Sequence, residues 1–165
     1  MPRREEGRGT HLYKVRCQWS GSTGAGYDAY DRTHTASAPP ASPHLNLSAD
    51  PAFLGDSDLL NPEQLVVLAA ASCQLLSFLA VAARARVDVL GYEDEAQGVM
   101  PEADRPVRLT SISLRPTIRV AVGVSEDRVM HLVDVAHREC YIANSLRTEV
   151  RVEPTVIVEG SAGRP

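Results

Sequence analysis

The sequence predicts an α+β fold built on antiparallel or mixed sheets. Hydrophobic residues make up 44% and charged residues 23% of the 165 residues, which is the composition of a globular domain with its own core. The expected elements run in the order β-β-α-β-β-α-β, whereas a parallel sheet is built by regular alternation of strand and helix. The most apolar segment, which begins near residue 62, is long enough to form a long buried central helix. We expect one domain over residues 11–159, between a disordered tail at 1–10 and a second tail at 160–165.

The charge and the cysteine content exclude several classes of protein. The chain carries 17 basic and 21 acidic residues and a net charge of −4, whereas a nucleic-acid-binding domain needs a basic face. Its three cysteines are too few for a secreted disulfide scaffold, and the charged N-terminus is unlike a signal peptide. We therefore expect a cytoplasmic protein with reduced thiols and no nucleic-acid partner.

The N-terminal part predicts two strands and a long connection. Alternating apolar residues at 11–19 predict a half-buried strand, and a glycine-rich turn at 21–26 leads to a second strand at 27–36. The turn is not a dinucleotide-binding fingerprint, because no helix follows it. Residues 37–60 contain several prolines and no clear periodicity, and a connection of this length is often a lid or a binding loop.

The central helix has clear boundaries. Asn61 is a good N-cap, Pro62 suits the first helical position, and Glu63 favours the positive end of the helix. We expect the helix to end at about Arg84 or Arg86. Within it, residues 66–83 reach the lower length of a transmembrane helix. Polar residues interrupt this stretch and no basic clusters flank it, so we expect a core helix and no membrane partner.

The C-terminal half predicts three further strands and two helices. Strands are expected at 87–100, 107–122 and 148–158, and Ser125 is expected to cap the second helix. Residues 141–146 predict a separate short turn of helix.

Two of the cysteines lie in distinctive motifs. A free cysteine is most often a buried small hydrophobe, and this remains the expectation for Cys17. Cys73 ends the segment NPEQLVVLAAASC at 61–73, and Cys140 lies in AHRECYIANSL at 136–146. The two segments resemble the first and second cysteine motifs of the OsmC/Ohr family of hydroperoxide reductases, and the likeness extends over residues 11–158.

The resemblance implies a function and an assembly. Cys73 would be the peroxidatic thiolate that becomes a sulfenic acid, and Cys140 would resolve it by forming a disulfide with it. A dithiol such as a lipoylated protein would then reduce the disulfide. The family forms intertwined homodimers with active sites at the interface, protects against oxidative stress, and implies no cofactor for the reaction.

The family also holds its thiolate with an arginine that is oriented by a glutamate. Glu63 matches the glutamate, but ten residues of straight helix separate it from Cys73 by about 15 Å. Either the segment before the helix folds back, or Glu63 serves a site built with the partner chain; a helix-dipole carboxylate is the structural alternative. Arg32 is the best candidate for the arginine, and an exposed strand arginine is its alternative.

Several features leave other functions open. Gln74 stands where an aromatic residue is common, and Tyr141 where a proline often follows the second cysteine. These departures motivate a second hypothesis, a non-catalytic dimer that binds a small hydrophobic ligand. His137 precedes Cys140 by three residues and could orient it, but His131 faces elsewhere and too few ligands are present to predict a metal site.

Overall fold

The computed structural model describes residues 9–160, and the chain groups into two compact units that divide between Pro62 and Glu63. Most of the two predicted tails, residues 1–8 and 161–165, lies outside the described residues. The predicted single domain over 11–159 stays a prediction.

The first unit contains a three-stranded antiparallel sheet in the order β1-β2-β3. Its strands are β1 (Arg16–Gln18), β2 (His34–Ser37) and β3 (His44–Leu47), and a 3-10 helix, η1 (Pro51–Phe53), follows them. The strands predicted at 11–19 and 27–36 each form only near their ends. Every residue of β1 is exposed, so the expectations of a half-buried strand and of a buried Cys17 are wrong. Residues 27–33 are held instead by side chains that bond to the backbone, and such bonds compete with strand pairing.

The predicted long connection at 37–60 is an ordered part of this unit. It contains β3 and η1, and a bridge between Leu47 and Leu60 closes the part that follows β3. Ser48 is buried and its hydroxyl accepts a hydrogen bond of 3.1 Å from the Asp56 N–H. At Gly55 an added Cβ would lie 1.7 Å from the carbonyl oxygen of Ala49, so only glycine fits this closure.

The second unit holds two three-stranded sheets, three helices and both motif cysteines. Its helices are α1 (Pro62–Arg84), α2 (Glu126–Glu139) and α3 (Tyr141–Ser145). Its strands are β4 (Val89–Asp94), β5 (Gln97–Val99), β6 (Ser111–Leu114), β7 (Pro116–Ala121), β8 (Glu149–Val152) and β9 (Thr155–Glu159). The sheet orders are β4-β7-β9 and β5-β6-β8; β7 and β9 pair in parallel, as do β6 and β8, and the other pairs are antiparallel. The predicted α+β class with mixed sheets is confirmed.

Each long strand predicted in this half is divided into two, because the chain passes from one sheet into the other. The divisions separate β4 from β5, β6 from β7, and β8 from β9. At this corner the Arg115 N–H donates to Oδ1 of Asp94 over 2.7 Å, and the Glu153 N–H donates to the Leu114 carbonyl over 2.8 Å. The divided strands thus stay bonded to one another through the bend.

Helix α1 begins and ends where the sequence predicts. At its C-terminus the Val87 N–H donates to the Ala82 carbonyl and the Arg86 N–H donates to the Ala83 carbonyl, and Arg86 has a φ of 56°. This is the Schellman arrangement, in which a residue in the left-handed conformation closes the helix.

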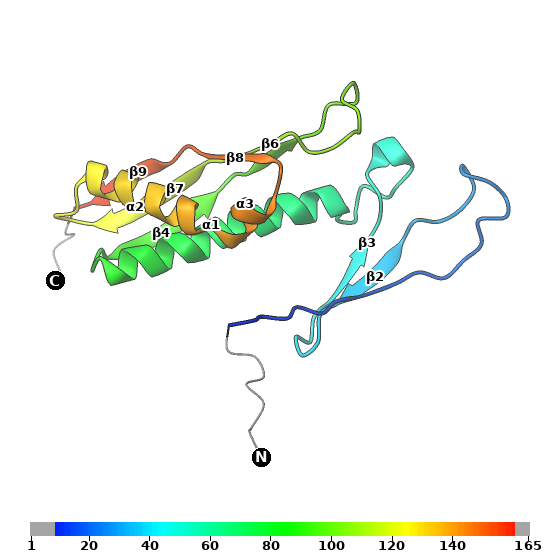
Figure 1. The fold of residues 1–165 in the computed structure, drawn as a ribbon, viewed down its shortest axis with the longest axis horizontal. Coiled ribbons are helices and arrows are strands. Elements are labelled where there is room, and N and C mark those ends of the chain that lie inside the picture. Colours follow the sequence, from blue (N-terminus) through cyan, green and yellow to red (C-terminus); the bar gives the residue numbers. More distant parts are fainter. Residues whose placement is uncertain (1–8, 161–165) are drawn as a thin grey trace, which may run out of the picture. The chain divides into compact units, whose positions relative to one another are not determined.

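Only one face of α1 is buried, so the prediction of a long buried helix is correct for that face and wrong for the opposite face. That face, Ala70, Gln74, Phe78, Val81 and Ala82, packs on the sheets, beside which α1 runs in Figure 1. The opposite face exposes leucines, and α1 is long and apolar enough to cross a membrane by length and composition. Core helices of soluble proteins meet the same criterion, and the absence of a membrane partner stays a prediction.

Helices α2 and α3 also follow the prediction. The Ser125 hydroxyl accepts a hydrogen bond of 3.3 Å from the Arg128 N–H at the start of α2, which is the predicted cap. The apolar face of α2 joins α1, β4 and β7 in one hydrophobic cluster. Cys140 is the one residue between α2 and α3, and this places it opposite the middle of α1.

Candidate active site

The two motif cysteines lie in contact inside the second unit. Cys73 is half-buried on α1 and Cys140 is buried at the junction of α2 and α3. Two bonds hold α1 against α2: Gln74 Nε2 donates to Val133 O over 3.4 Å, and Arg84 Nη2 pairs with Glu139 Oε2 at 2.9 Å. The Cys140 thiol lies close enough to Cys73 to lower the pKa of the Cys73 thiol.

The surroundings of Cys73 favour its thiolate. Burial is the largest single effect and raises the pKa of the Cys73 thiol, but four hydrogen bonds together outweigh it and lower the pKa. The donors are the Ile142 N–H, the Cys140 thiol, the Tyr141 N–H and the Ser77 hydroxyl. Tyr141 and Ile142 open α3, where backbone N–H groups have no acceptor within the helix and favour a negative charge.

The surroundings of Cys140 have the opposite effect. Burial raises the pKa of the Cys140 thiol, and both its hydrogen bond to Cys73 and the charge of that thiolate raise it further. Hydrogen bonds from the N–H groups of Ala143 and Ile142 lower it by less. Cys73 therefore loses its proton first, while Cys140 stays protonated and donates to it.

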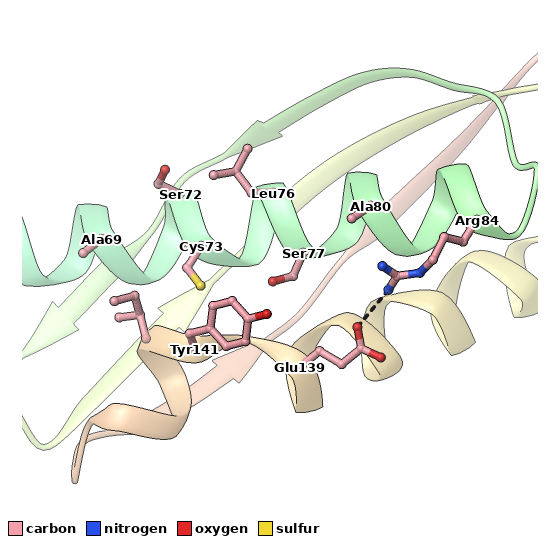
Figure 2. Close-up of a pocket in the computed structure, with 10 residues that line it drawn as sticks. Ala69, Ser72, Cys73, Leu76, Ser77, Ala80, Arg84, Glu139 and Tyr141 are labelled. Carbon is pink, nitrogen blue, oxygen red and sulfur yellow. Dashed lines mark hydrogen bonds and ion pairs between the residues drawn. The ribbon is translucent and has the colours of Figure 1, made fainter. Parts of the chain in front are cut away.

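Cys73 opens onto a pocket of about 420 Å³ on the exposed face of α1. The size suits a small organic ligand. The lining residues are Ala69, Ser72, Cys73, Leu76, Ser77, Ala80, Arg84, Glu139, Tyr141 and Ile142. In Figure 2 the sulfur of Cys73 points toward α3, and the Arg84–Glu139 ion pair lies farther along the helix. A ligand in this pocket would reach Cys73 before Cys140, which is only 1% exposed.

Glu63 does not meet Cys73 within the chain. Glu63 lies in the first turn of the regular helix α1. The alternative in which a segment before the helix folds back and carries Glu63 to Cys73 is therefore wrong. The ten-residue separation along continuous helix then amounts to about 15 Å. A role for Glu63 in a site built with a partner chain stays a prediction.

Arg32 is held by its own loop in the first unit. Its guanidinium donates to Tyr30 O over 2.9 Å and to Tyr27 O over 2.7 Å, and it lies 4.0 and 4.7 Å from the ring centroids of the same two tyrosines. Trp19 Nε1 donates to Asp31 O over 2.7 Å and steadies the loop. Arg32 is thus neither in a strand nor fully exposed, and its predicted role beside the thiolate stays a prediction.

The remaining motif residues have structural surroundings. Gln74 is buried next to Cys73, and its amide faces α2 instead of the pocket. His137 is half-buried, and its carbonyl accepts the Cys140 N–H over 3.2 Å. Among residues 9–160, no group of histidine, cysteine and acidic side chains could hold a metal ion.

Ser77 and the two N–H groups at the start of α3 were not predicted from the sequence as parts of the site. Ser77 follows Cys73 by four residues, a spacing that places two side chains together on a helix, so the sequence contained this signal. The N–H donors depend on how α3 meets α1, which no local pattern specifies.

Comparison with solved structures finds the same fold. An OsmC-like protein of unknown function from Vibrio cholerae is 28% identical, with a TM-score of 0.78, over 88% of this chain and 100% of its own. The organic hydroperoxide resistance protein OsmC from Legionella pneumophila is 16% identical, with a TM-score of 0.65, over 90% of this chain and 98% of its own. An organic hydroperoxide resistance protein from Elizabethkingia anophelis is 18% identical, with a TM-score of 0.66, over 90% and 99%. The last two show likeness of fold alone.

A comparison with curated proteins gives no match. The family model described as OsmC-like protein matches residues 55–155, a range that includes α1 and both cysteines of the site. This match confirms the resemblance of the two cysteine motifs to the OsmC/Ohr family. The chain belongs to the OsmC-like protein family.

Proposed function

We propose that this protein is a thiol-dependent peroxidase that reduces organic or inorganic hydroperoxides. One observation carries the proposal: Cys73 and Cys140 lie close together, and their interaction lowers the pKa of the Cys73 thiol and raises the pKa of the Cys140 thiol. A low-pKa thiolate that ligands can reach, with a protonated thiol beside it, is what a two-cysteine peroxidase requires. The hydroperoxide-resistance proteins of the same fold support the proposal.

The reaction proceeds in two steps at the two sulfurs. The Cys73 thiolate attacks the terminal oxygen of the hydroperoxide, the O–O bond breaks, and the alkoxide leaves and is protonated to an alcohol. The Cys73 sulfur is then a sulfenic acid. The Cys140 sulfur attacks it, an S–S bond forms as the S–O bond breaks, and the proton of Cys140 and the leaving hydroxide make water. An external dithiol, for which a lipoylated protein is our candidate, reduces the disulfide by exchange.

A homodimer in the cytoplasm is part of the same proposal. The exposed face of α1 carries Leu68, Leu76 and Leu79, which are 57%, 64% and 39% exposed, and apolar surface of this kind commonly marks a contact with another chain. A second copy would also explain how Glu63 could serve a thiolate that its own helix keeps distant. Arg32 is our candidate for the cation of that site.

The test is the rate of peroxide consumption with a dithiol reductant. We compare cumene hydroperoxide with hydrogen peroxide for the parent, Cys73→Ser and Cys140→Ser, with Cys17→Ser as the matched thiol control. We expect no turnover in Cys73→Ser, a single stoichiometric event in Cys140→Ser, and parental turnover in Cys17→Ser.

Equal rates of peroxide consumption by the parent and Cys73→Ser would contradict the proposal. If the parent does not turn over and its thiols remain titratable after peroxide, the second hypothesis gains support. In that case the pocket beside Cys73 would bind a small hydrophobic ligand without chemistry.

A further inference from the structure

The pocket beside Cys73 extends along α1 as a stripe of lining side chains. Cys73, Ser77, Ala80 and Arg84 all line it, and they follow one another at spacings of three or four residues, which places side chains on one face of a helix. The two residues in the middle of the stripe are small. A ligand that reacts at Cys73 therefore has room to extend along the helix toward Arg84.

An ion pair forms the far end of this stripe. Arg84 Nη2 lies 2.9 Å from Glu139 Oε2, and both residues line the pocket. Among the described residues that line it, only these two carry an acidic or basic side chain. In Figure 2 the Arg84 side chain turns back toward Ala80 and meets Glu139 at the end of α2. With a rise of 1.5 Å per residue, the two charges lie about 10 to 16 Å beyond Cys73 along the helix.

The wall opposite Cys73 is apolar. Tyr141 and Ile142 of α3 line the pocket there, and Figure 2 places the ring of Tyr141 across from Cys73 and Ser77. Tyr141 is 81% exposed, so much of its ring surface is available to a ligand. The pocket is thus apolar or small-walled near the reactive sulfur and charged at its far end.

This change of lining makes the length of an apolar ligand matter. As far as Ala80, an apolar chain can lie against small side chains and the Tyr141 ring, and its burial is favourable. A longer tail either covers the ion pair, which removes water from two charges at a cost, or extends into solvent and buries nothing more. Since an extended chain advances about 3.5 Å per three bonds, the limit lies about nine bonds from the sulfur.

Folding needs this ion pair little. The side chains of Arg84 and Glu139 are 64% and 52% exposed, and exposed ion pairs contribute little to stability. The hydrophobic cluster that joins α1, α2 and the sheet holds the two helices together without them. The two charges can therefore be removed or exchanged while the pocket beside Cys73 is kept.

We propose that Arg84 and Glu139 are specificity-determining residues that restrict the site to compact organic hydroperoxides and select against those with long apolar tails. The inference rests on the proposed function for the group that reacts. The selection arises from an unfavourable contact with the wrong ligand, which is one of the two general routes to specificity. Neither side chain takes part in the chemistry at Cys73.

The experiment measures the effect of ligand length with a thiol reagent and without any peroxide. In a Cys17→Ser background, the full-length reduced protein reacts with N-ethyl-, N-hexyl- or N-decylmaleimide, each of which forms one thioether with the Cys73 sulfur. By the length estimate above, the hexyl chain ends near Ala80 and the decyl chain reaches the ion pair. Mass spectrometry gives each rate and the modified residue. Each rate is divided by that of glutathione with the same reagent, and then by that of the same variant with N-ethylmaleimide, so that general changes in thiol reactivity cancel.

The quantity of interest is the ratio of the decyl rate to the hexyl rate. In the double variant Arg84→Ala with Glu139→Ala we expect this ratio to rise about fourfold or more over the parent, the effect of at least one further buried methylene group. The charge exchange, Arg84→Glu with Glu139→Arg, should keep the parental ratio because an ion pair remains. Arg138→Ala is the matched control, because Arg138 is exposed next to Glu139 and does not line the pocket.

The outcomes separate this inference from the proposed function. A decyl-to-hexyl ratio in the double alanine variant equal to that in Arg138→Ala would overturn the length selection, as would a charge-exchanged variant with the ratio of the double alanine variant. A parent that consumes no peroxide, together with the expected rise in the double alanine variant, would sink the peroxidase and keep the length selection. A parent that turns over peroxide while the ratio does not respond would do the reverse.

Discussion

Replacement of Ser77 by alanine removes one of the four hydrogen bonds that lower the pKa of Cys73. A hydrogen bond to a charged group contributes about 1.5 kcal/mol at the lower end of its range. Water can reach the half-exposed sulfur and replace about half of that loss, which leaves about 0.7 kcal/mol, or roughly a threefold shift from thiolate to thiol. The more basic thiolate that remains is a better nucleophile. We therefore expect the reaction rate of Cys73 at neutral pH to fall about two- to threefold.

The assay is alkylation of Cys73 by iodoacetamide, followed by mass spectrometry in a Cys17→Ser background. Ser77→Thr keeps the hydroxyl and should react at the rate of the parent. A Ser77→Ala variant that reacts as fast as the parent, or a Ser77→Thr variant as slow as Ser77→Ala, would refute this role of Ser77. Either result would mean that the hydroxyl does not bond to the thiolate.

Three further predictions concern stability; thermal unfolding tests the first, and urea unfolding tests the other two. Arg86 has a left-handed conformation at the end of α1, which glycine adopts without strain. Arg86→Gly should therefore stabilise the protein by about 1 kcal/mol and raise its Tm by about 2–4 °C. An unchanged Tm would show that Arg86 is not strained. Burial raises the pKa of Asp94 above its ordinary 3.8, so its contribution to stability is full below that pH and is lost as the pH rises through the folded-state pKa. Asp94→Asn should therefore become progressively more stable than the parent from about pH 4 upward, and a constant difference would count against it. Gly55→Ala should cost about 2 kcal/mol or more, because its Cβ would overlap the backbone of Ala49; a variant as stable as the parent would show that the loop adapts.

The sequence predicted best those features that local chemistry determines. The helix starts at Pro62 and after Ser125 follow from residues that cap helices. The pairing of Cys73 with Cys140 was instead implied by the resemblance of their two motifs to a known family. These signals act within a few residues of the chain, so a single sequence contains them.

The missed features depend on contacts between distant segments. The corner that divides the strands is made by Asp94 and Arg115, which are 21 residues apart, and nothing in the alternation of either strand marks it. The loop around Arg32 shows the same limit, because its pattern resembles a strand while bonds to the carbonyls of Tyr27 and Tyr30 favour a loop. Burial of the whole of α1 was predicted, because its apolar composition gave no sign that one of its faces is exposed in the single chain.

The position of Cys73 against the first turn of α3 makes this short helix dependent on the chemical state of one sulfur. Cys140 precedes α3 but gives it no side-chain cap within the described chain, so the Cys73 thiolate supplies the missing acceptor from another element. A helix of five residues has little stability of its own. Once Cys73 is oxidised or alkylated, the amides of Tyr141 and Ile142 lose that acceptor and should exchange with solvent faster. Hydrogen exchange at these two positions would then record the oxidation state of the protein without a probe attached to either cysteine.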